Sequence, residues 1–269
     1  MKTKHSILRK GSFPPSPTGT PRRDGGESSI PRKIIGVIPA RYTSTRFPGK
    51  ALIPIDGIPM VARVYFQVER VSLLDSVVVA TDSKRVVEAM EVLDIPVVLT
   101  SSGCRTGSDR VAEVARNGDG DIYVNIQGDE PFIEVGVIEK AVEPFLTNGE
   151  LKMGTIASTA LTAEEWTDRN VVKVRVNKDD FAEEFFRTSP ESFLPAHTYK
   201  HIGLYVFEKS FLLEFSRMKR TVQEKERHLE QLRAMDYGIP IKVVLTNYND
   251  FSIDTPEDLQ HVQEILGLG

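Results

Sequence analysis

Short apolar runs alternate with stretches of helical periodicity along the first half of the chain. Runs rich in Val and Ile are expected to form buried strands at positions 34–38, 77–80, 95–99 and 122–126. Stretches with apolar residues every three or four positions are expected to be helices at 83–93, 108–116 and 135–146. Strands separated by helices pair in parallel through right-handed crossovers, so this alternation predicts an α/β fold on a parallel sheet.

The pattern changes after about residue 153, where extended runs follow one another with few helices between them. These runs lie at 154–160, 171–176, 183–187 and 201–207, and they predict an inserted β-rich region over residues 153–210. Helical periodicity returns at 211–217 and 224–235, and a late strand is expected at 241–245. A terminal helix begins near Pro256, which suits the first helical position, with Thr255 or Asp254 as its N-cap.

Composition places the chain among ordinary globular proteins with one main domain, expected over residues 33–269. A net charge of −4 and a pI of about 5.8 exclude the electrostatic footprint of a general nucleic-acid binder. The single cysteine, Cys104, excludes an internal disulfide framework and a CxxC-type zinc site, which suits a reducing cytoplasm. Membrane insertion is not expected, because no apolar run approaches the ~18 residues of a span.

Residues 1–32 differ from the rest in being rich in Pro, Ser, Thr and Gly, with scattered Lys and Arg. This composition predicts a disordered extension, since it offers too little apolar surface to offset the entropy of ordering. An organelle transit peptide is the alternative, but a clear amphipathic period is missing.

A basic, hydroxyl-rich segment at residues 39–50 follows the first expected strand. Arg41, Arg46 and Lys50 are separated by small hydroxyl residues, Ser44 among them, and a Pro-Gly turn closes the segment. Cations, hydroxyls and backbone N–H groups can surround a polyphosphate, and the carboxyl ends of parallel strands are where such sheets bind ligands. Because Ala51 follows Lys50, the segment is not a Walker A loop. A basic surface turn is the alternative interpretation.

Two carboxylates are candidates for a Mg²⁺ site. Asp129 follows the fourth expected strand directly after a glycine, and Asp254 lies at the junction before the terminal helix. Mg²⁺ usually takes one or two protein carboxylates and completes its shell with phosphate and water oxygens. A turn residue is the alternative for Asp129, and a simple helix cap is the alternative for Asp254.

Taken together, six segments in register resemble the 3-deoxy-manno-octulosonate (Kdo) cytidylyltransferase family, from about residue 34 to the C-terminus. They are residues 39–50, 79–82, 125–131, 201–205, 229–233 and 254–259. The resemblance implies a Rossmann-like nucleotidyltransferase sheet with a smaller inserted β-rich dimerisation region. It also implies a cytoplasmic homodimer that uses Mg²⁺ to transfer CMP from CTP to the anomeric hydroxyl of Kdo, releasing pyrophosphate.

The resemblance also implies roles for individual residues. Arg41 and Lys50 would hold the triphosphate, and Asp129 and Asp254 would hold Mg²⁺. The expected nucleotide contacts are Arg41, Ser44, Arg46, Lys50, Thr81, Ser108, Arg110 and Gln127. The expected acid-sugar contacts are Arg187, His201, Tyr205, Glu230 and Gln231.

Three positions depart from the family pattern and leave alternatives open. Cys104 stands where the family has histidine, Phe186 where it has serine, and Arg227 where it has an acid. The last two fall near the expected sugar site, so another acid sugar, such as an amino-substituted Kdo or a nonulosonate, is one alternative. A nucleotide-binding protein without turnover is the other. Cys104 itself is a small, semi-buried residue or a reactive thiol.

Overall fold

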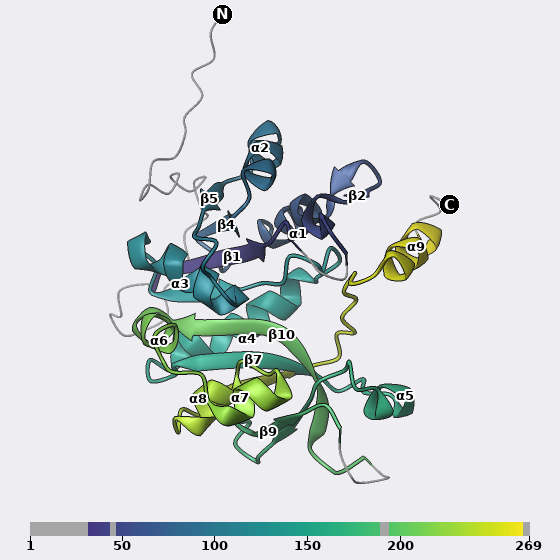
Figure 1. Cartoon of the computed structure of the whole chain (residues 1–269). Helices are drawn as coiled ribbons and strands as arrows, with labels where there is room; N and C mark the ends of the chain where they lie inside the picture. The colour runs from purple at the N-terminus through teal and green to yellow at the C-terminus, as the bar shows by residue number, and fades with distance from the viewer. Residues whose placement is uncertain (1–31, 44–46, 189–193, 266–269) are drawn as a thin grey trace, which may run out of the picture.

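A mixed β-sheet forms the centre of the molecule in the computed structural model, which describes residues 32–43, 47–188 and 194–265 (Figure 1). The strands follow the order β11-β7-β10-β6-β1-β4-β5 across the sheet. Their bounds are β1 (Ile34–Ala40), β4 (Ser76–Thr81), β5 (Val97–Leu99), β6 (Ile122–Asn125), β7 (Met153–Ser158), β10 (Thr198–Glu208) and β11 (Ile241–Thr246).

The predicted parallel arrangement is confirmed for the first half of the chain. Strand β1 pairs in parallel with β4 on one side and with β6 on the other, and β5 continues the sheet beyond β4. The second half reverses direction, because β10 runs antiparallel to both β6 and β7. This reversal was not predicted, since periodicity shows that a strand exists but not which way it runs.

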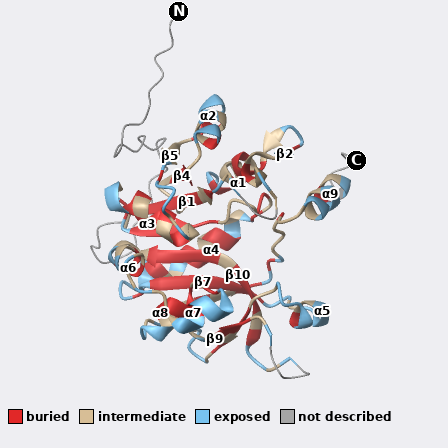
Figure 2. Ribbon diagram, viewed as in Figure 1, coloured by how far each residue is buried: buried red, intermediate tan, exposed pale blue. Residues whose placement is uncertain are grey.

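Helices cover both faces of the sheet, giving three layers. Successive residues of β1 face opposite sides, so Ile34 and Ile38 join one apolar cluster while Ile35 and Val37 join the other. The first face is covered by α1 (Met60–Val68), α2 (Lys84–Val92) and α4 (Val135–Thr147), and the second by α3 (Gly107–Asn117), α6 (Lys209–Phe215) and α8 (Leu232–Asp236). Figure 2 shows the resulting buried centre and exposed outer helix surfaces.

The expected β-rich region is continuous with the main sheet. Strands β7 and β10 belong to the sheet itself, and only β8 (Lys173–Val176) and β9 (Ala182–Phe186) extend from it, through the pairing of β8 with one end of β10. One short helix, α5 (Ala163–Thr167), lies between β7 and β8. It begins at a capping box formed by Thr162 and Glu165.

The single helix predicted over residues 224–235 is wrong, because this stretch forms α7 (Val222–Arg227) and α8 with a break between them. His228 ends α7 in the left-handed conformation, with φ of 53°. The break lets Arg233 turn back onto Glu224 in a buried ion pair. Apolar spacing continues across the break, so periodicity alone could not reveal it.

A short helix, a hairpin and the helix α1, which follow β1 in this order, were not predicted. The 3₁₀-helix η1 (Lys50–Leu52) precedes β2 (Pro54–Ile55) and β3 (Ile58–Pro59), which are joined by Asp56 and Gly57, both with positive φ. The Asp-Gly dipeptide is a hairpin signal that could have identified this turn. The terminal helix α9 (Pro256–Ile265) packs here, through a small apolar cluster that includes Ile55 and Val262.

The disorder prediction for residues 1–32 lies almost wholly outside the described residues, which start at Arg32. Within the part of the chain that the structure describes, no helix has both the length and the apolar character needed to cross a membrane.

Candidate active site at the carboxyl ends of β1 and β6

The segment after β1 turns tightly and presents Lys50 to the sheet edge. The backbone N–H of Gly49 donates to the carbonyl oxygen of Tyr42 at 3.0 Å, which closes the loop. Gly49 has φ of 74°, a conformation that favours glycine, and it caps η1, whose first residue is Lys50. The backbone of Lys50 is therefore held in position beside the carboxyl end of β1.

Lys50 joins the two carboxylates predicted for the metal site. Its Nζ lies 2.6 Å from Oδ2 of Asp129 and 2.8 Å from Oδ1 of Asp254. Two backbone contacts bring these segments together. A Cβ at Gly128 would lie 2.8 Å from the carbonyl oxygen of Pro39, so only glycine allows the chain after β6 to pass this close to β1. The N–H of Ile253 donates to the carbonyl oxygen of Asp129 at 3.0 Å.

Asp254 is available for this contact because another residue caps the helix. The side chain of Asp258 accepts hydrogen bonds from the backbone N–H groups of Asp254 and Thr255, both at 2.8 Å. Thr255 Oγ1 accepts from the N–H of Asp258, which completes a capping box. Thr255 is thus the N-cap, and the Asp254 carboxylate faces Lys50.

The electrostatics of the cluster suit a site for cations. Burial alone would lower the pKa of Lys50, but the attraction of Asp129 and Asp254 outweighs it and raises the pKa above its ordinary value. Two carboxylates that converge on one ammonium supply the oxygen donors that Mg²⁺ prefers. The described residues hold no cluster of three or more His, Cys, Asp or Glu side chains that could bind a metal, so a bound ion would depend on phosphate and water oxygens too.

Of the remaining cations in the phosphate segment, the structure describes Arg41. This side chain is exposed and donates from Nη2 to the carbonyl oxygen of Cys104 at 2.6 Å, across the strand ends. Ser44 and Arg46, both predicted nucleotide contacts, lie outside the described residues.

Three further predicted nucleotide contacts are already engaged in internal hydrogen bonds. The carbonyl oxygen of Thr81 accepts from Thr100, and Arg110 is fully buried between Thr100 and Asp82, with its Nη2 2.8 Å from Asp82 Oδ2. Ser108, also buried, accepts a hydrogen bond from the Asn125 amide. These side chains support the loops around the site.

Gln127 links the nucleotide side of the site to β10. Its Nε2 donates to the carbonyl oxygen of Gly203 at 2.6 Å. Gly203 lies at an irregularity in the pairing of β10 with β7, between Ile202 and Tyr205. The predicted nucleotide contact is therefore held against the strand that carries two of the predicted sugar contacts.

His201 and Tyr205 lie on one face of β10, as their spacing predicted, with ring centroids 5.5 Å apart. Burial, with a smaller contribution from the charge of Arg187, lowers the pKa of His201 to about 3, so the ring is neutral at physiological pH. Thr155 Oγ1 donates to the carbonyl oxygen of Leu204 and lies 2.9 Å from His201 Nε2. The single proton of the Thr155 hydroxyl goes to Leu204, so Oγ1 can only accept a hydrogen bond from His201. We therefore assign the imidazole proton to Nε2, which leaves Nδ1 as an acceptor.

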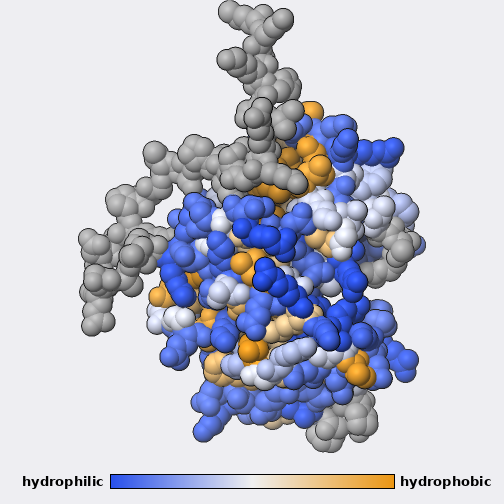
Figure 3. All heavy atoms as spheres, turned by 60° about the vertical axis from the view of Figure 1, so that its left-hand side comes forward, coloured by the Kyte–Doolittle hydropathy of each residue, from blue (hydrophilic) through white to orange (hydrophobic). Residues whose placement is uncertain are grey.

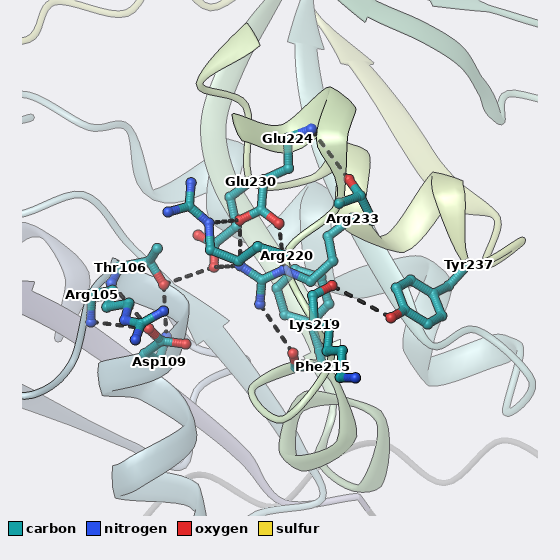
Figure 4. A network of polar contacts seen from close by, with 11 residues as sticks. Arg105, Thr106, Asp109, Phe215, Lys219, Arg220, Glu224, Glu230, Arg233 and Tyr237 are labelled. Atoms are coloured by element: carbon teal, nitrogen blue, oxygen red, sulfur yellow. Dashed lines mark hydrogen bonds and ion pairs between the residues drawn. The ribbon is translucent and has the colours of Figure 1, made fainter. Parts of the chain in front are cut away.

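Glu230 lies in a polar network beside the first turn of α3 (Figure 4). Thr106, the N-cap of α3, donates to it at 2.7 Å, and Arg233 lies 3.7 Å away. Burial raises the pKa of Glu230 to about 7 despite these two partners. Its neighbour Gln231 is buried, and its Nε2 has no hydrogen-bond partner within the described residues. The amide therefore retains a donor for a ligand.

Arg187 and Arg227 line a cavity of about 590 Å³ at the edge of β9. Arg187 donates to the carbonyl oxygens of Arg169 and Asn170. Arg227 lies 3.1 Å from Oε1 of Glu184, so the arginine that departs from the family pattern has an acidic partner.

Cys104 does not have the environment of a reactive thiol. Burial and a hydrogen bond to Glu113 raise its pKa to about 11, so the thiolate is scarce at neutral pH. The interpretation as a small, semi-buried residue is favoured.

Sequence reasoning did not identify several residues that shape this site. Arg85 lies over the ring of Tyr42 at 5.2 Å and donates to its hydroxyl, which braces the phosphate segment. Glu130 follows Asp129, is almost completely buried, and has one carboxylate oxygen without a partner in the described chain. Thr106 could have been found from the Thr-x-x-Asp signature of a capping box.

Comparisons with known proteins agree with this geometry. A family model described as Cytidylyltransferase matches residues 35–243. The 3-deoxy-manno-octulosonate cytidylyltransferase of Trichlorobacter lovleyi is 42% identical over 88% of this chain and 100% of its own length. The enzyme of the same name from Geobacter metallireducens is 43% identical over 87% of this chain and 98% of its own length.

Solved structures extend the comparison to the fold. CMP:2-keto-3-deoxy-manno-octonic acid synthetase, solved in complex with CTP, superposes with a TM-score of 0.82 at 34% identity and covers 87% of this chain and 98% of its own. A 4-diphosphocytidyl-2C-methyl-D-erythritol synthase from Anaerococcus prevotii is 15% identical, with a TM-score of 0.59 over 88% of this chain and all of its own, and shares the fold alone. The predicted nucleotidyltransferase sheet is confirmed.

Proposed function

The chain belongs to the 3-deoxy-manno-octulosonate cytidylyltransferase family, and we propose that it transfers CMP from CTP to the anomeric hydroxyl of Kdo, releasing pyrophosphate. The observation that carries this proposal is the meeting of Lys50, Asp129 and Asp254 at the carboxyl ends of β1 and β6. Three segments far apart in sequence converge there, as a site for a metal-bound polyphosphate requires.

On the nucleotide side, positioning and charge neutralisation contribute most to such a transfer. The sugar oxygen attacks the α-phosphorus, the bond to the β-phosphate breaks, and pyrophosphate leaves with the electron pair. We assign Lys50 and Arg41 to the negative charge of the triphosphate. Lys50 already carries a full charge at this edge, because its two acidic partners raise its pKa.

Enzymes of this kind generally use a divalent metal, and we infer that Asp129 and Asp254 would hold it as Mg²⁺. When bound, the ion would lower the pKa of the attacking hydroxyl and offset charge on the α-phosphate. Before binding, the Lys50 ammonium keeps both carboxylates together and offsets one of their two negative charges. Its flexible stem then lets it move from the carboxylates toward the phosphates.

On the acceptor side, three groups on two elements offer complementary hydrogen bonds to a polyhydroxylated acid. His201 presents an unprotonated Nδ1, and burial raises the pKa of Tyr205, which therefore keeps its donor hydroxyl. Glu230, with a pKa of about 7, can accept or donate near neutral pH. Arg187, whose charge acts on His201, is our candidate for the sugar carboxylate.

The test is pyrophosphate release in the presence of Mg²⁺, comparing CTP with other nucleoside triphosphates and Kdo with a panel of 2-keto acid sugars. Release with CTP and Kdo is expected. Binding of CTP without release from any combination would instead support the nucleotide-binding protein without turnover. We also propose the cytoplasmic homodimer that the resemblance implies. Light scattering tests the oligomeric state, because a dimer has twice the mass of one chain.

A different acid sugar is a second candidate, favoured by the Arg227–Glu184 pair beside Arg187. If this pair shapes the acceptor site, Arg227→Glu would place a second acid beside Glu184. The ranking of acid sugars by kcat/KM should then change. Lys225→Glu, on the same helix and equally exposed, controls for the change in charge. An unchanged order would remove Arg227 from the specificity argument.

A further inference from the structure

A groove lies between α3, the segment that follows α6, and α7, and it adjoins the acceptor side of the candidate active site through Thr106 and Arg233. Its volume is about 970 Å³, within the range of ~300–1,000 Å³ typical of small-molecule sites. Lys50, Asp129 and Asp254 are not among its lining residues. Figure 3 brings the side of α3 and α6 forward and shows that hydrophilic residues cover most of this face.

The groove carries positive charge that the described residues do not compensate. Five exposed side chains line it and form no ion pair within the described residues, namely Arg105, Arg116, Arg217, Lys219 and Lys225. Two more arginines, Arg220 and Arg233, share the carboxylate of Glu224 (Figure 4). The groove thus concentrates cations on a chain whose net charge is −4.

The acids of the groove are already used by other donors. Asp109 accepts from the backbone N–H groups of Arg105 and Thr106, in the capping box of α3. Glu113 accepts from the backbone of Ser101 and from the thiol of Cys104. Neither carboxylate lies within ion-pair distance of the five cations, so a bound ligand has to supply the missing negative charge.

We propose that this groove is a second anion-binding site, for a small molecule that carries two or more phosphate groups. Arginine guanidinium groups bind phosphate oxygens in pairs, and lysines add charge from flexible stems. A di- or triphosphate carries about three to five negative charges, which matches the five unpaired cations.

The experiment titrates inorganic tripolyphosphate into the full-length protein by calorimetry, with a non-hydrolysable CTP analogue present to occupy the active site. The test variant is Arg217→Ala/Lys219→Ala/Lys225→Ala, which removes three groove cations. The matched control is Lys140→Ala/Lys152→Ala/Lys178→Ala, which removes three exposed lysines elsewhere on the molecule. Pyrophosphate release by both variants checks that the fold is intact.

We expect the wild type and the control to bind tripolyphosphate equally, and the groove variant to bind it at least ten-fold more weakly. Equal affinities in the two triple variants, or no binding by the wild type at millimolar concentration, would overturn the proposal. ATP titrated in the same way distinguishes a nucleotide from an inorganic chain, since recognition of the base would make ATP bind more tightly. Groove-dependent binding of a single-stranded oligonucleotide, with none of tripolyphosphate, would overturn the small-molecule assignment.

Discussion

At the scale of single residues, the chemistry of this site depends on which polar groups already have partners. The Asp254 carboxylate contacts Lys50, while Asp258 accepts the backbone hydrogen bonds at the start of α9. Arg110 shows the opposite case, since its two terminal nitrogens already bond Thr100 and Asp82 and the side chain is fully buried. Two predicted site residues thus differ in what they can offer a ligand.

Asp129→Asn tests the assignment of the carboxylates. The amide cannot neutralise a cation, so the paired acidic site would lose one of its two charges. We expect kcat to fall by at least about 100-fold, as for loss of a group that acts in the transition state. The melting temperature should change little, because Asp129 is partly exposed. Asp236→Asn, an exposed change on α8, is the control, and full activity in Asp129→Asn would remove the metal assignment.

The raised pKa of Glu230 predicts a pH dependence of stability. The carboxyl titrates at about 7 in the folded protein and near 4.5 when unfolded, so folding favours its protonated form. This contribution is complete below pH 4.5 and is lost as the pH rises through 7. Relative to Glu230→Gln, which cannot ionise, the free energy of unfolding of the wild type should fall by ~1–3 kcal/mol between pH 5 and pH 8.

Urea denaturation at the two pH values measures this difference. Glu226→Gln, an exposed change in the same segment, should follow the wild type at both. If the wild type and Glu230→Gln lose stability in parallel, Glu230 does not titrate in this range, and its proposed double role as donor and acceptor fails with it.

At the scale of elements, hydrophobic periodicity identified β1, β4, β5 and β6 and the helices α2, α3 and α4, because each buries one regular face, but it missed α1 and the hairpin before it. It could not identify features that depend on distant partners. The reversal of β10 is fixed by its pairing with β6 and β7. The break between α7 and α8 depends on His228 in a left-handed conformation and on the pairing of Arg233 with Glu224.

The candidate site shows the same division. Lys50 and Asp129 were predictable because each follows a buried strand, at the edge where ligands bind. The hydrogen bond from Thr106 to Glu230 could not be predicted, because it joins residues 124 positions apart. Contacts of that kind become visible only when the sheet brings the segments together.

The ion pair between α7 and α8 gives a prediction about stability. Glu224 is 1% exposed and Arg233 is 3% exposed, with contacts of 2.8 and 2.6 Å between them. Arg233→Met would leave the Glu224 charge without its main partner and should cost ~3–5 kcal/mol. The double variant Glu224→Met/Arg233→Met should regain part of that loss, because the buried Glu224 charge is then removed as well. Chemical denaturation gives the free energy of unfolding of both variants. A double variant no more stable than Arg233→Met would contradict this account.

At the scale of the whole molecule, the candidate active site and the basic groove differ in how their cations are balanced. At the candidate active site, two acids surround the single charge of Lys50 and are our proposed metal ligands. The second leaves its cations without acidic partners among the described residues. We therefore expect this chain, with a net charge of −4, to bind small anions through local fields and not through its overall charge.

The last prediction concerns the first 31 residues. The family model begins at residue 35, and the Trichlorobacter lovleyi enzyme aligns over its full length with 88% of this chain. The described contacts begin with Arg32, which donates to the carbonyl oxygen of Phe145, and with Lys33, whose N–H donates to Asp121. Removal of residues 1–31 keeps both contacts, so we expect kcat/KM within about two-fold of the full chain and a melting temperature within about 2 °C.

The matched comparison removes residues 1–36, which deletes the first half of β1 as well as both contacts. Strand β1 pairs with β4 and β6 and supplies Ile34 and Ile35 to the cores on opposite faces of the sheet. Loss of these residues should prevent folding, because it opens the centre of the sheet. If the shorter deletion also lost activity while its melting temperature stayed the same, residues 1–31 would act in binding or turnover, and the catalytic unit would extend beyond the part shared with the family.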